Sequence, residues 1–170
     1  MSIKVTLIII LCFILIGIAF FYKDDVKEHF LKDTLLLNSS LGTLEIDQKI
    51  ISNDIKKLET DFGAQQKVNN VIVLESIKYQ KELNFNKLHI KLQEEGVVAI
   101  VSENEKTFTD RGIKVGDSLT KVKELYGENY INKTGELGNI LLYKDKENNI
   151  KIEFLYYNDQ VVQIMLIKLD

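Results

Sequence analysis

The side chains that most often carry chemistry are few and scattered in this sequence. The one cysteine, Cys12, falls within an apolar stretch, and the two histidines, His29 and His89, are far apart. A structural zinc site needs about four ligands of these types, and a catalytic thiol or serine needs a neighbouring base. Residues 112–116 (Gly-Ile-Lys-Val-Gly) lack the lysine–serine ending of a phosphate-binding loop, and no nucleophile-elbow motif occurs. We therefore predict no enzyme, no catalytic residue, no metal ion and no cofactor.

The acidic candidates fit structural positions better than acid–base chemistry. Asp110, Asp117 and Asp159 are separated in sequence and fall at expected turns or helix caps. His89 alternates with apolar neighbours, which places it on the outward face of an expected strand. A small envelope hydrolase that uses a carboxylate pair is the least favoured alternative.

Composition narrows the class of protein further. The chain has 170 residues, of which 45% are hydrophobic and 28% charged, with a formal net charge of −3. This hydrophobic content is typical of a folded chain, and a weakly acidic protein is a poor partner for nucleic acid. A single cysteine excludes a disulfide framework within the chain.

An apolar opening segment predicts a membrane anchor. Residues 5–22 contain one clearly polar side chain, Thr6, and a helix of that length spans about 27 Å, close to the hydrocarbon core of a bilayer. We expect a single-pass transmembrane signal-anchor over residues 1–22, in the cell membrane. Cleavage as a signal peptide is an alternative, because Gly17 and Ala19 place small residues ahead of a cut before Phe20.

The orientation of the anchor follows from two opposing indications. Lys23, Lys27 and Lys32 follow the apolar segment, and a count of positive charges favours a cytoplasmic location for the rest of the chain, residues 23–170, here called the body. The signal-anchor character and the lack of cysteine in the body favour export. We expect an extracytoplasmic body.

Apolar residues and a glycine recur at an offset of 64 residues, which indicates a duplicated supersecondary unit. The corresponding pairs include Ile55 with Leu119, Leu58 with Val122, Phe62 with Tyr126, Gly63 with Gly127, Tyr79 with Tyr143, Leu88 with Ile152, Ile90 with Phe154, Val98 with Val162 and Ile100 with Ile164.

Each repeat predicts a helix that is closed by its glycine in a positive-φ conformation and followed by three antiparallel strands. Asp117 or Ser118 is the expected cap of the second helix, and residues 158–160 form an expected hairpin turn. The predicted fold class is α+β: an N-terminal transmembrane helix followed by two tandem helix-plus-three-strand antiparallel units. The predicted parts are a transmembrane signal-anchor (1–22), a juxtamembrane helix and linker (23–40, helical to 37), a first unit (41–104; helix 53–62, strands 71–79, 87–93 and 97–103) and a second unit (105–170; helix after 118, strands 140–143, 150–157 and 161–168).

One segment of the chain resembles a pattern found in known proteins. It consists of Arg111-Gly112-Ile113-Lys114-Val115-Gly116-Asp117-Ser118, followed by Val122, Leu125, Tyr126 and Gly127. It resembles a "G-I-x-x-G-D-S-x-x-x-V-x-x-x-Y-G" segment of membrane-anchored or exported proteins of Gram-positive bacteria. The unit as a whole resembles β-lactamase-inhibitor-protein-like tandem repeats and outer-membrane-assembly lipoprotein folds. The resemblance covers residues 107–168 well and 46–104 weakly, where Ser52-Asn53 replaces Gly116-Asp117. It implies a binding or scaffold module without catalytic residues.

A strip of apolar residues is the predicted partner-binding site. Strand alternation places Ile152, Phe154 and Tyr156 inward and leaves four side chains on the opposite face: Leu155, Tyr157, Val161 and Met165. Aromatic and methionine side chains are enriched at protein interfaces. The competing interpretation is that the first unit or the juxtamembrane helix covers this strip.

Together these patterns favour a membrane-tethered extracytoplasmic protein-binding or scaffold module of the cell envelope. Its expected contacts are the membrane through residues 5–22 and another envelope protein or a cell-wall polymer, and no nucleic acid. The alternative is an inhibitor or immunity-like protein that blocks an enzyme through its sheet face.

Overall fold

The structure is a computed structural model, which describes residues 32–67, 77–94, 96–135 and 138–169. The predicted anchor at 1–22 and the first part of the predicted juxtamembrane helix lie outside these residues. Lys32–Asp170 forms one compact unit. Its elements are β1 (Ser40–Leu41), β2 (Leu44–Glu45), α3 (Ser52–Phe62), β3 (Lys81–Phe85), β4 (Leu88–Gln93), β5 (Gly96–Ser102), α4 (Leu119–Tyr126), β6 (Ile131–Gly135), β7 (Gly138–Asp145), β8 (Ile150–Tyr157) and β9 (Gln160–Lys168).

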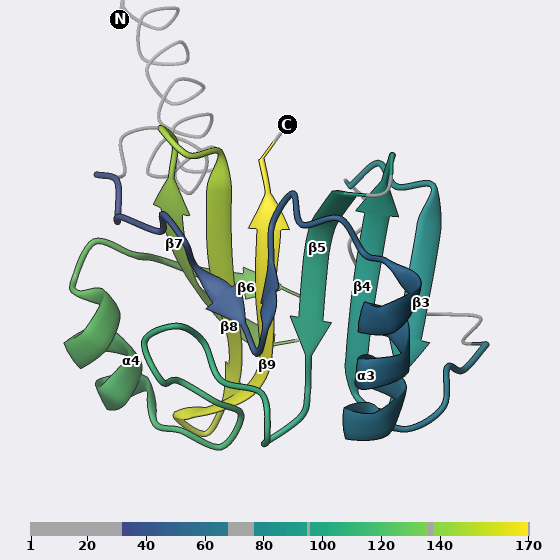
Figure 1. The fold of residues 1–170 in the computed structure, drawn as a ribbon. Helices are drawn as coiled ribbons and strands as arrows, with labels where there is room; N and C mark the ends of the chain where they lie inside the picture. The colour runs from purple at the N-terminus through teal and green to yellow at the C-terminus, as the bar shows by residue number, and fades with distance from the viewer. Residues whose placement is uncertain (1–31, 68–76, 95, 136–137, 170) are drawn as a thin grey trace, which may run out of the picture. The chain divides into compact units, whose positions relative to one another are not determined.

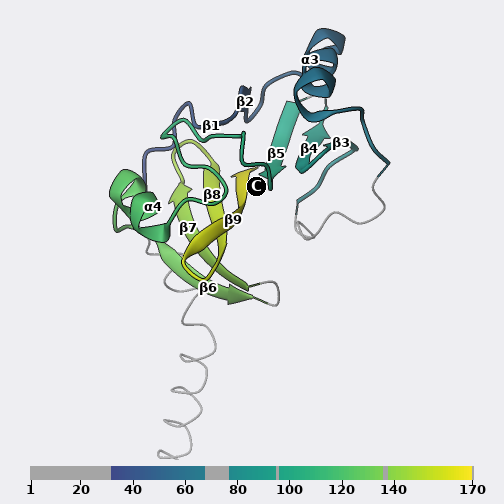
Figure 2. The same ribbon diagram turned by 90° about the horizontal axis from the view of Figure 1, so that it is seen from below.

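The unit is built on one antiparallel sheet of seven strands in the order β3-β4-β5-β9-β8-β7-β6, with β1 and β2 as a separate short pair. Both helices and the β1–β2 pair lie on the same face of the sheet (Figures 1 and 2). Their buried side chains join those of the strands in one hydrophobic core. The α+β class and the antiparallel strands are confirmed.

The strand registers repeat at the offset that the sequence predicts. Each central hairpin has a β-bulge, between Lys91 and Leu92 in the first and between Leu155 and Tyr156 in the second, 64 residues later. The two hairpins join where β5 pairs with β9, and there Val101 lies opposite the residue 64 positions further along the chain. The sheet is therefore symmetric about this pair, as expected where two equivalent hairpins meet edge to edge.

The outer strands depart from the prediction. Phe85 pairs with Leu88, and Tyr143 pairs with Ile152, so Tyr143 corresponds to Phe85 and not to Tyr79. The predicted strand 71–79 is wrong for residues 77–79, which have no regular structure, and its remainder lies outside the described residues. The strand beside β4 is Lys81–Phe85, and the second half has an additional edge strand, β6. A length difference between the repeats thus shifts their first strands.

Both helices begin and end as their sequences predict. The hydroxyl of Ser118 accepts a hydrogen bond from the backbone N–H of Lys121, which satisfies a free donor of the first turn of α4. Gly63 and Gly127 end the two helices with φ of 88° and 87°. Residues that carry a side chain are strained in this conformation, whereas glycine is not. The predicted helix 53–62 and both positive-φ glycines are confirmed.

The segment that enters the unit is extended, so the predicted helix over 23–37 is wrong for residues 32–37. The backbone N–H of Thr34 donates to the carbonyl of Lys144, and that of Leu36 donates to the carboxylate of Asp145 at 2.7 Å. Leu36 is fully buried, whereas Leu35 and Leu37 are exposed. Alternating burial and contacts with β7 favour an extended strap over a helix at this position.

Candidate functional site

The four residues of the predicted partner-binding strip lie in different environments. Tyr157 is 70% exposed and Leu155 is half-buried, but Val161 is 1% and Met165 is 4% exposed. The bulge in the β8–β9 hairpin explains the error at Val161, because one extra residue reverses the alternation. Val161 therefore joins the main core, and the next residue, Val162, is 40% exposed.

Met165 points to the face away from the helices, as predicted, but it is buried there. It packs in a small cluster with Ala99, Val101 and Ile167, against which Ile77 and Leu155 lie. The strip is thus not a continuous exposed surface. Of its four members, Tyr157 alone is fully available to a partner.

Polar side chains on this face are paired with one another. Nδ1 of His89 lies 2.8 Å from Oδ1 of Asn84, and the amide of Gln163 donates to Glu103 at 2.7 Å. Burial lowers the pKa of His89, although the negative charge of Glu103 acts in the opposite direction. His89 lies on the outward face of its strand, as predicted, on the same face as Val101 and Met165. It is half-buried there, with its imidazole hydrogen-bonded to Asn84.

The three aspartates singled out from the sequence have structural positions. The carboxylate of Asp117 accepts the backbone N–H of Lys114 at 2.9 Å and the ammonium of Lys121 at 2.8 Å. Burial acts to raise the pKa of Asp117, but these bonds outweigh it and leave the pKa below its usual value. Asp110 lies 3.4 Å from the hydroxyl of Tyr126, and Asp159 occupies a positive-φ turn position between β8 and β9.

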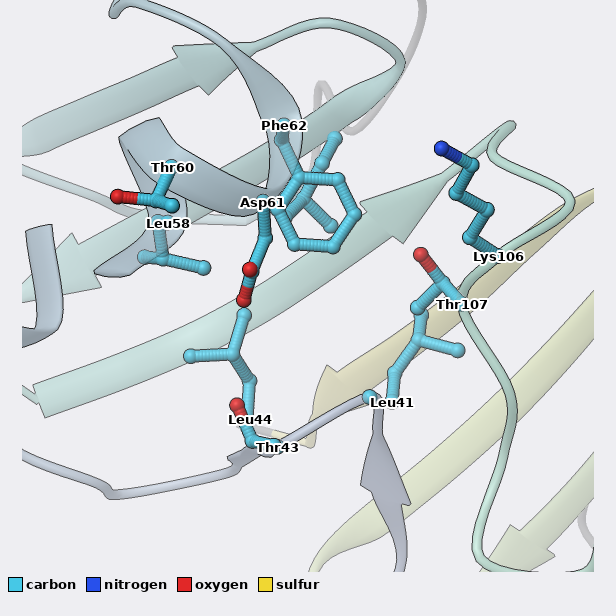
Figure 3. A pocket seen from close by; sticks show the side chains of 11 residues that line it. Leu41, Thr43, Leu44, Leu58, Thr60, Asp61, Phe62, Lys106 and Thr107 are labelled. Atoms are coloured by element: carbon cyan, nitrogen blue, oxygen red, sulfur yellow. The ribbon is translucent and has the colours of Figure 1, made fainter. Parts of the chain in front are cut away.

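A cavity of about 450 Å³ lies beneath the C-terminal end of α3, between this helix, the β1–β2 turn and the loop after β5 (Figure 3). Its apolar lining comes from Leu41, Leu44, Leu58, Phe62 and Leu88, and its polar lining from Thr43, Thr60, Asp61, Lys106 and Thr107, with Gly42 between. The lining is thus mixed, with an apolar wall and several polar groups, and a concave site that combines the two is a candidate for binding a small ligand.

The corresponding place in the second half is filled. There Tyr126, the counterpart of Phe62, is 4% exposed, and its ring centroid lies 5.2 Å from that of Tyr143 and 5.2 Å from that of Phe154. Phe62 is half-buried and lines the cavity. In the first half an isoleucine, Ile90, stands where Phe154 stands in the second. The place at the end of the helix is therefore filled by three aromatic rings in the second half and adjoins a cavity in the first.

One polar atom of the cavity wall has no partner. The hydroxyl of Thr107, a residue that is 1% exposed, makes no hydrogen bond within the described part of the chain. Figure 3 shows this oxygen directed into the space below Phe62 and Lys106. A buried hydroxyl without a partner costs about 1–3 kcal/mol, so each such group calls for an explanation.

Two charged side chains stand at the mouth of the cavity. The carboxylate of Asp61 and the ammonium of Lys106 lie on either side of the Phe62 ring (Figure 3). Neither forms an ion pair with any residue that the structure describes. Beyond Phe62 a second, more polar hollow of about 460 Å³ shares these three residues and adds Gly63, Asn86, Lys87, Asn104 and Glu105.

Sequence reasoning did not find this site, because its residues come from separate segments and form no motif. The one signal in the sequence is a difference between the repeats: the first has the smaller residue Ile90 where the second has Phe154. Thr107 and Lys106 fall in an irregular loop with no pattern of their own.

Comparisons with known proteins give one distant structural likeness. No protein-family model matches the chain, and no curated protein matches its sequence. The chain is similar to an extracellular protein containing an SCP domain from Bacillus anthracis strain Ames, with 9% sequence identity and a TM-score of 0.43. The match covers 74% of this chain and 48% of the other, so the chain spans about half the length of that protein.

The residues that the structure describes hold no group of three or more histidine, cysteine, aspartate or glutamate side chains that could bind a metal ion. They also contain no helix long and apolar enough to cross a membrane, and residues 5–22 are not among them.

Proposed function

We propose that this protein is a membrane-tethered extracytoplasmic binding module of the cell envelope, which engages another envelope protein or a cell-wall polymer and performs no catalysis. The observation that carries the proposal is the cavity beneath α3. It is hollow where the equivalent place in the second half is filled by three aromatic rings, and it retains an unpartnered buried hydroxyl, Thr107. A cavity that costs stability and is not filled is a feature that ligand binding explains.

The apolar segment at residues 5–22 supports the tether, and the resemblance of residues 111–127 to exported proteins of Gram-positive bacteria supports the extracytoplasmic side. Protease added to intact protoplasts should degrade the body of the full-length protein. Protection until lysis would place the body in the cytoplasm instead.

The binding role is tested by closing the cavity without disturbing the core. Thr60 is exposed, lies on α3 and lines the mouth, so Thr60→Trp should cover the opening. Lys56 is exposed on the same helix one turn earlier and is not part of the lining, so Lys56→Trp is the matched control. Full-length protein on beads is incubated with solubilised envelope proteins and with purified cell-wall sacculi.

The proposal expects that wild type and Lys56→Trp retain the same envelope component and that Thr60→Trp loses it. Equal retention by all three proteins would mean that the cavity is not the binding site. Retention of nothing by wild type would contradict the binding module itself.

A second candidate function rests on the exposed end of the β8–β9 hairpin. Tyr157 is 70% and Val162 is 40% exposed, and an exposed aromatic side chain is a common anchor in protein interfaces. An inhibitor or immunity-like protein that blocks an enzyme through this face would lose its partner on Tyr157→Ala and keep it on Thr60→Trp.

A further inference from the structure

The two charges at the mouth of the cavity make its two sides different. Asp61 and Lys106 both have exposed side chains, but they stand on opposite sides of Phe62 (Figure 3). Thr107 follows Lys106 directly in the chain, and its hydroxyl lies on the Lys106 side. Within this cavity, the side of Lys106 and Thr107 therefore offers a positive charge and a hydrogen-bond donor, and the side of Asp61 offers a negative charge. Lys87 and Glu105 line only the second hollow.

A carboxylate group fits the Lys106 side. Its two oxygens can accept a hydrogen bond from the Thr107 hydroxyl and pair with the Lys106 ammonium, and hydrogen bonds to an ionised group are stronger than those between neutral groups. Such a ligand would satisfy the hydroxyl that has no partner in the described part of the chain. The cavity also has an apolar wall of Leu41, Leu44 and Leu88, which favours an apolar group next to the carboxylate.

Asp61 fits the rest of the same ligand. A carboxylate accepts hydrogen bonds but cannot donate them, so Asp61 favours an N–H group or an ammonium on its side and disfavours a second anion. A carboxylate, an apolar side chain and an N–H group on one carbon atom are the parts of the last residue of a peptide.

We infer that the cavity binds the free carboxyl end of a peptide whose last residue is apolar. This inference rests on the proposed function, since it names the chemical group that the binding module takes up. The peptide is either the end of a protein chain or a short free peptide, and the two share the same terminal chemistry.

The experiment measures binding of defined peptides by isothermal titration calorimetry to the full-length chain in lipid nanodiscs, with empty nanodiscs as the blank. The reference probe is N-acetyl-Ala-Leu. Its C-terminal amide removes the carboxylate, N-acetyl-Ala-Ser removes the apolar side chain, and Ala-Leu with a free amino group distinguishes the two sources. Tighter binding of Ala-Leu than of the acetylated probe indicates a short free peptide, and equal binding indicates the end of a protein chain.

The inference expects the amide and the serine probe each to bind about tenfold more weakly than N-acetyl-Ala-Leu. Lys106→Gln should weaken the acid by about the same factor and leave the amide unchanged, because the amide has no charge to lose. Lys56→Gln, an exposed control on α3 outside the cavity, should change neither.

Thr107→Val separates binding from folding. Replacing a buried hydroxyl that has no partner with a methyl group should leave the melting temperature unchanged or raise it. The same substitution should weaken binding of the acid. A binding loss without a stability loss is a result that a purely structural threonine would not give.

Three results would overturn the inference: equal affinity for the acid and its amide, unchanged affinity in Lys106→Gln, or no saturable binding of the acid at about 10 mM. If Thr60→Trp still abolishes retention of envelope material in any of these cases, the binding module stands and only its ligand chemistry is wrong.

Discussion

Replacing Tyr126 with alanine should cost much more stability than replacing Phe62, although the two residues occupy equivalent positions at the ends of α4 and α3. Tyr126 is 4% exposed and contacts two other rings at centroid distances of 5.2 Å. Truncation of a buried aromatic side chain costs about 3–5 kcal/mol, and each ring pair adds about 0.5–1.5 kcal/mol. We expect Tyr126→Ala to lower the free energy of unfolding by about 4–5 kcal/mol.

Phe62 is half-buried, and one side of its ring faces a space that is already empty. Its truncation enlarges an open cavity instead of creating a closed one, so little packing is lost beyond the area that it buries. We expect Phe62→Ala to lower the free energy of unfolding by about 1–2 kcal/mol.

Urea unfolding of the full-length variants, followed by far-ultraviolet circular dichroism, measures both losses. The denaturant dependence should stay the same, since both variants retain the same folded unit. Equal losses, or a larger loss for Phe62→Ala, would refute the view that the first half is hollow where the second is filled.

Three other predictions concern stability alone. Gly127→Val should cost about 1–3 kcal/mol in urea unfolding, because φ is 87° and ψ is −174° at this position. Asp145→Ala should cost about 3–5 kcal/mol, because the buried carboxylate accepts the N–H of Leu36 and two hydrogen bonds from Asn148. Met165→Ala should cost about 2–4 kcal/mol, whereas Tyr157→Ala should cost less than about 0.5 kcal/mol.

The prediction for Asp145 has a pH dependence of known sign. Burial acts to raise the pKa of Asp145, but the hydrogen bonds from Leu36 and Asn148 outweigh it and lower the pKa. A lowered pKa in the folded state gives stability that is complete above about pH 4 and is lost as the pH falls through the folded-state value. Asp145→Ala should therefore flatten the acid limb of the stability profile below about pH 4. An unchanged acid limb would remove Asp145 from this role.

Contradicting results for the other two predictions are equally direct. A Gly127→Val protein as stable as wild type would mean that the helix end can change conformation without cost. If Met165→Ala lowers the free energy of unfolding no more than Tyr157→Ala does, Met165 is exposed, and the partner-binding strip predicted from the sequence is supported.

Local features of the fold were predictable because they depend on neighbouring residues. The apolar spacing and the terminal glycine of α3 are contained within a few turns, and the hairpin turn at Asn158-Asp159 follows from residues that tolerate positive φ. The 64-residue offset was visible because the central hairpins keep their length in both halves.

Features that depend on one inserted residue were not predictable from alternation. A bulge places Val161 in the core and Val162 at the surface, and no sequence signal marks the bulge. The shift between β3 and β7 has a different origin: a six-residue change of length between the repeats puts Phe85, and not Tyr79, where Tyr143 lies in the second half.

The candidate site could not be predicted from the sequence for a different reason. Asp61 at the end of α3 and Thr107 in the loop after β5 meet only through tertiary packing, and neither belongs to a recognisable motif. An unpartnered hydroxyl is a property of its surroundings, which become visible only when the surrounding segments are placed in space.

The central claim, that the hollow first half is a ligand site and the filled second half is not, can be tested within one molecule by methyl nuclear magnetic resonance. The methyl groups of Leu41, Leu44, Leu58 and Leu88 report on the cavity, and those of Val122 and Ile152 report on the equivalent place in the second half. Titration of the full-length chain with N-acetyl-Ala-Leu should shift the first set in a saturable manner and leave the second set unchanged. Shifts of equal size in both sets, or in neither, would contradict the account.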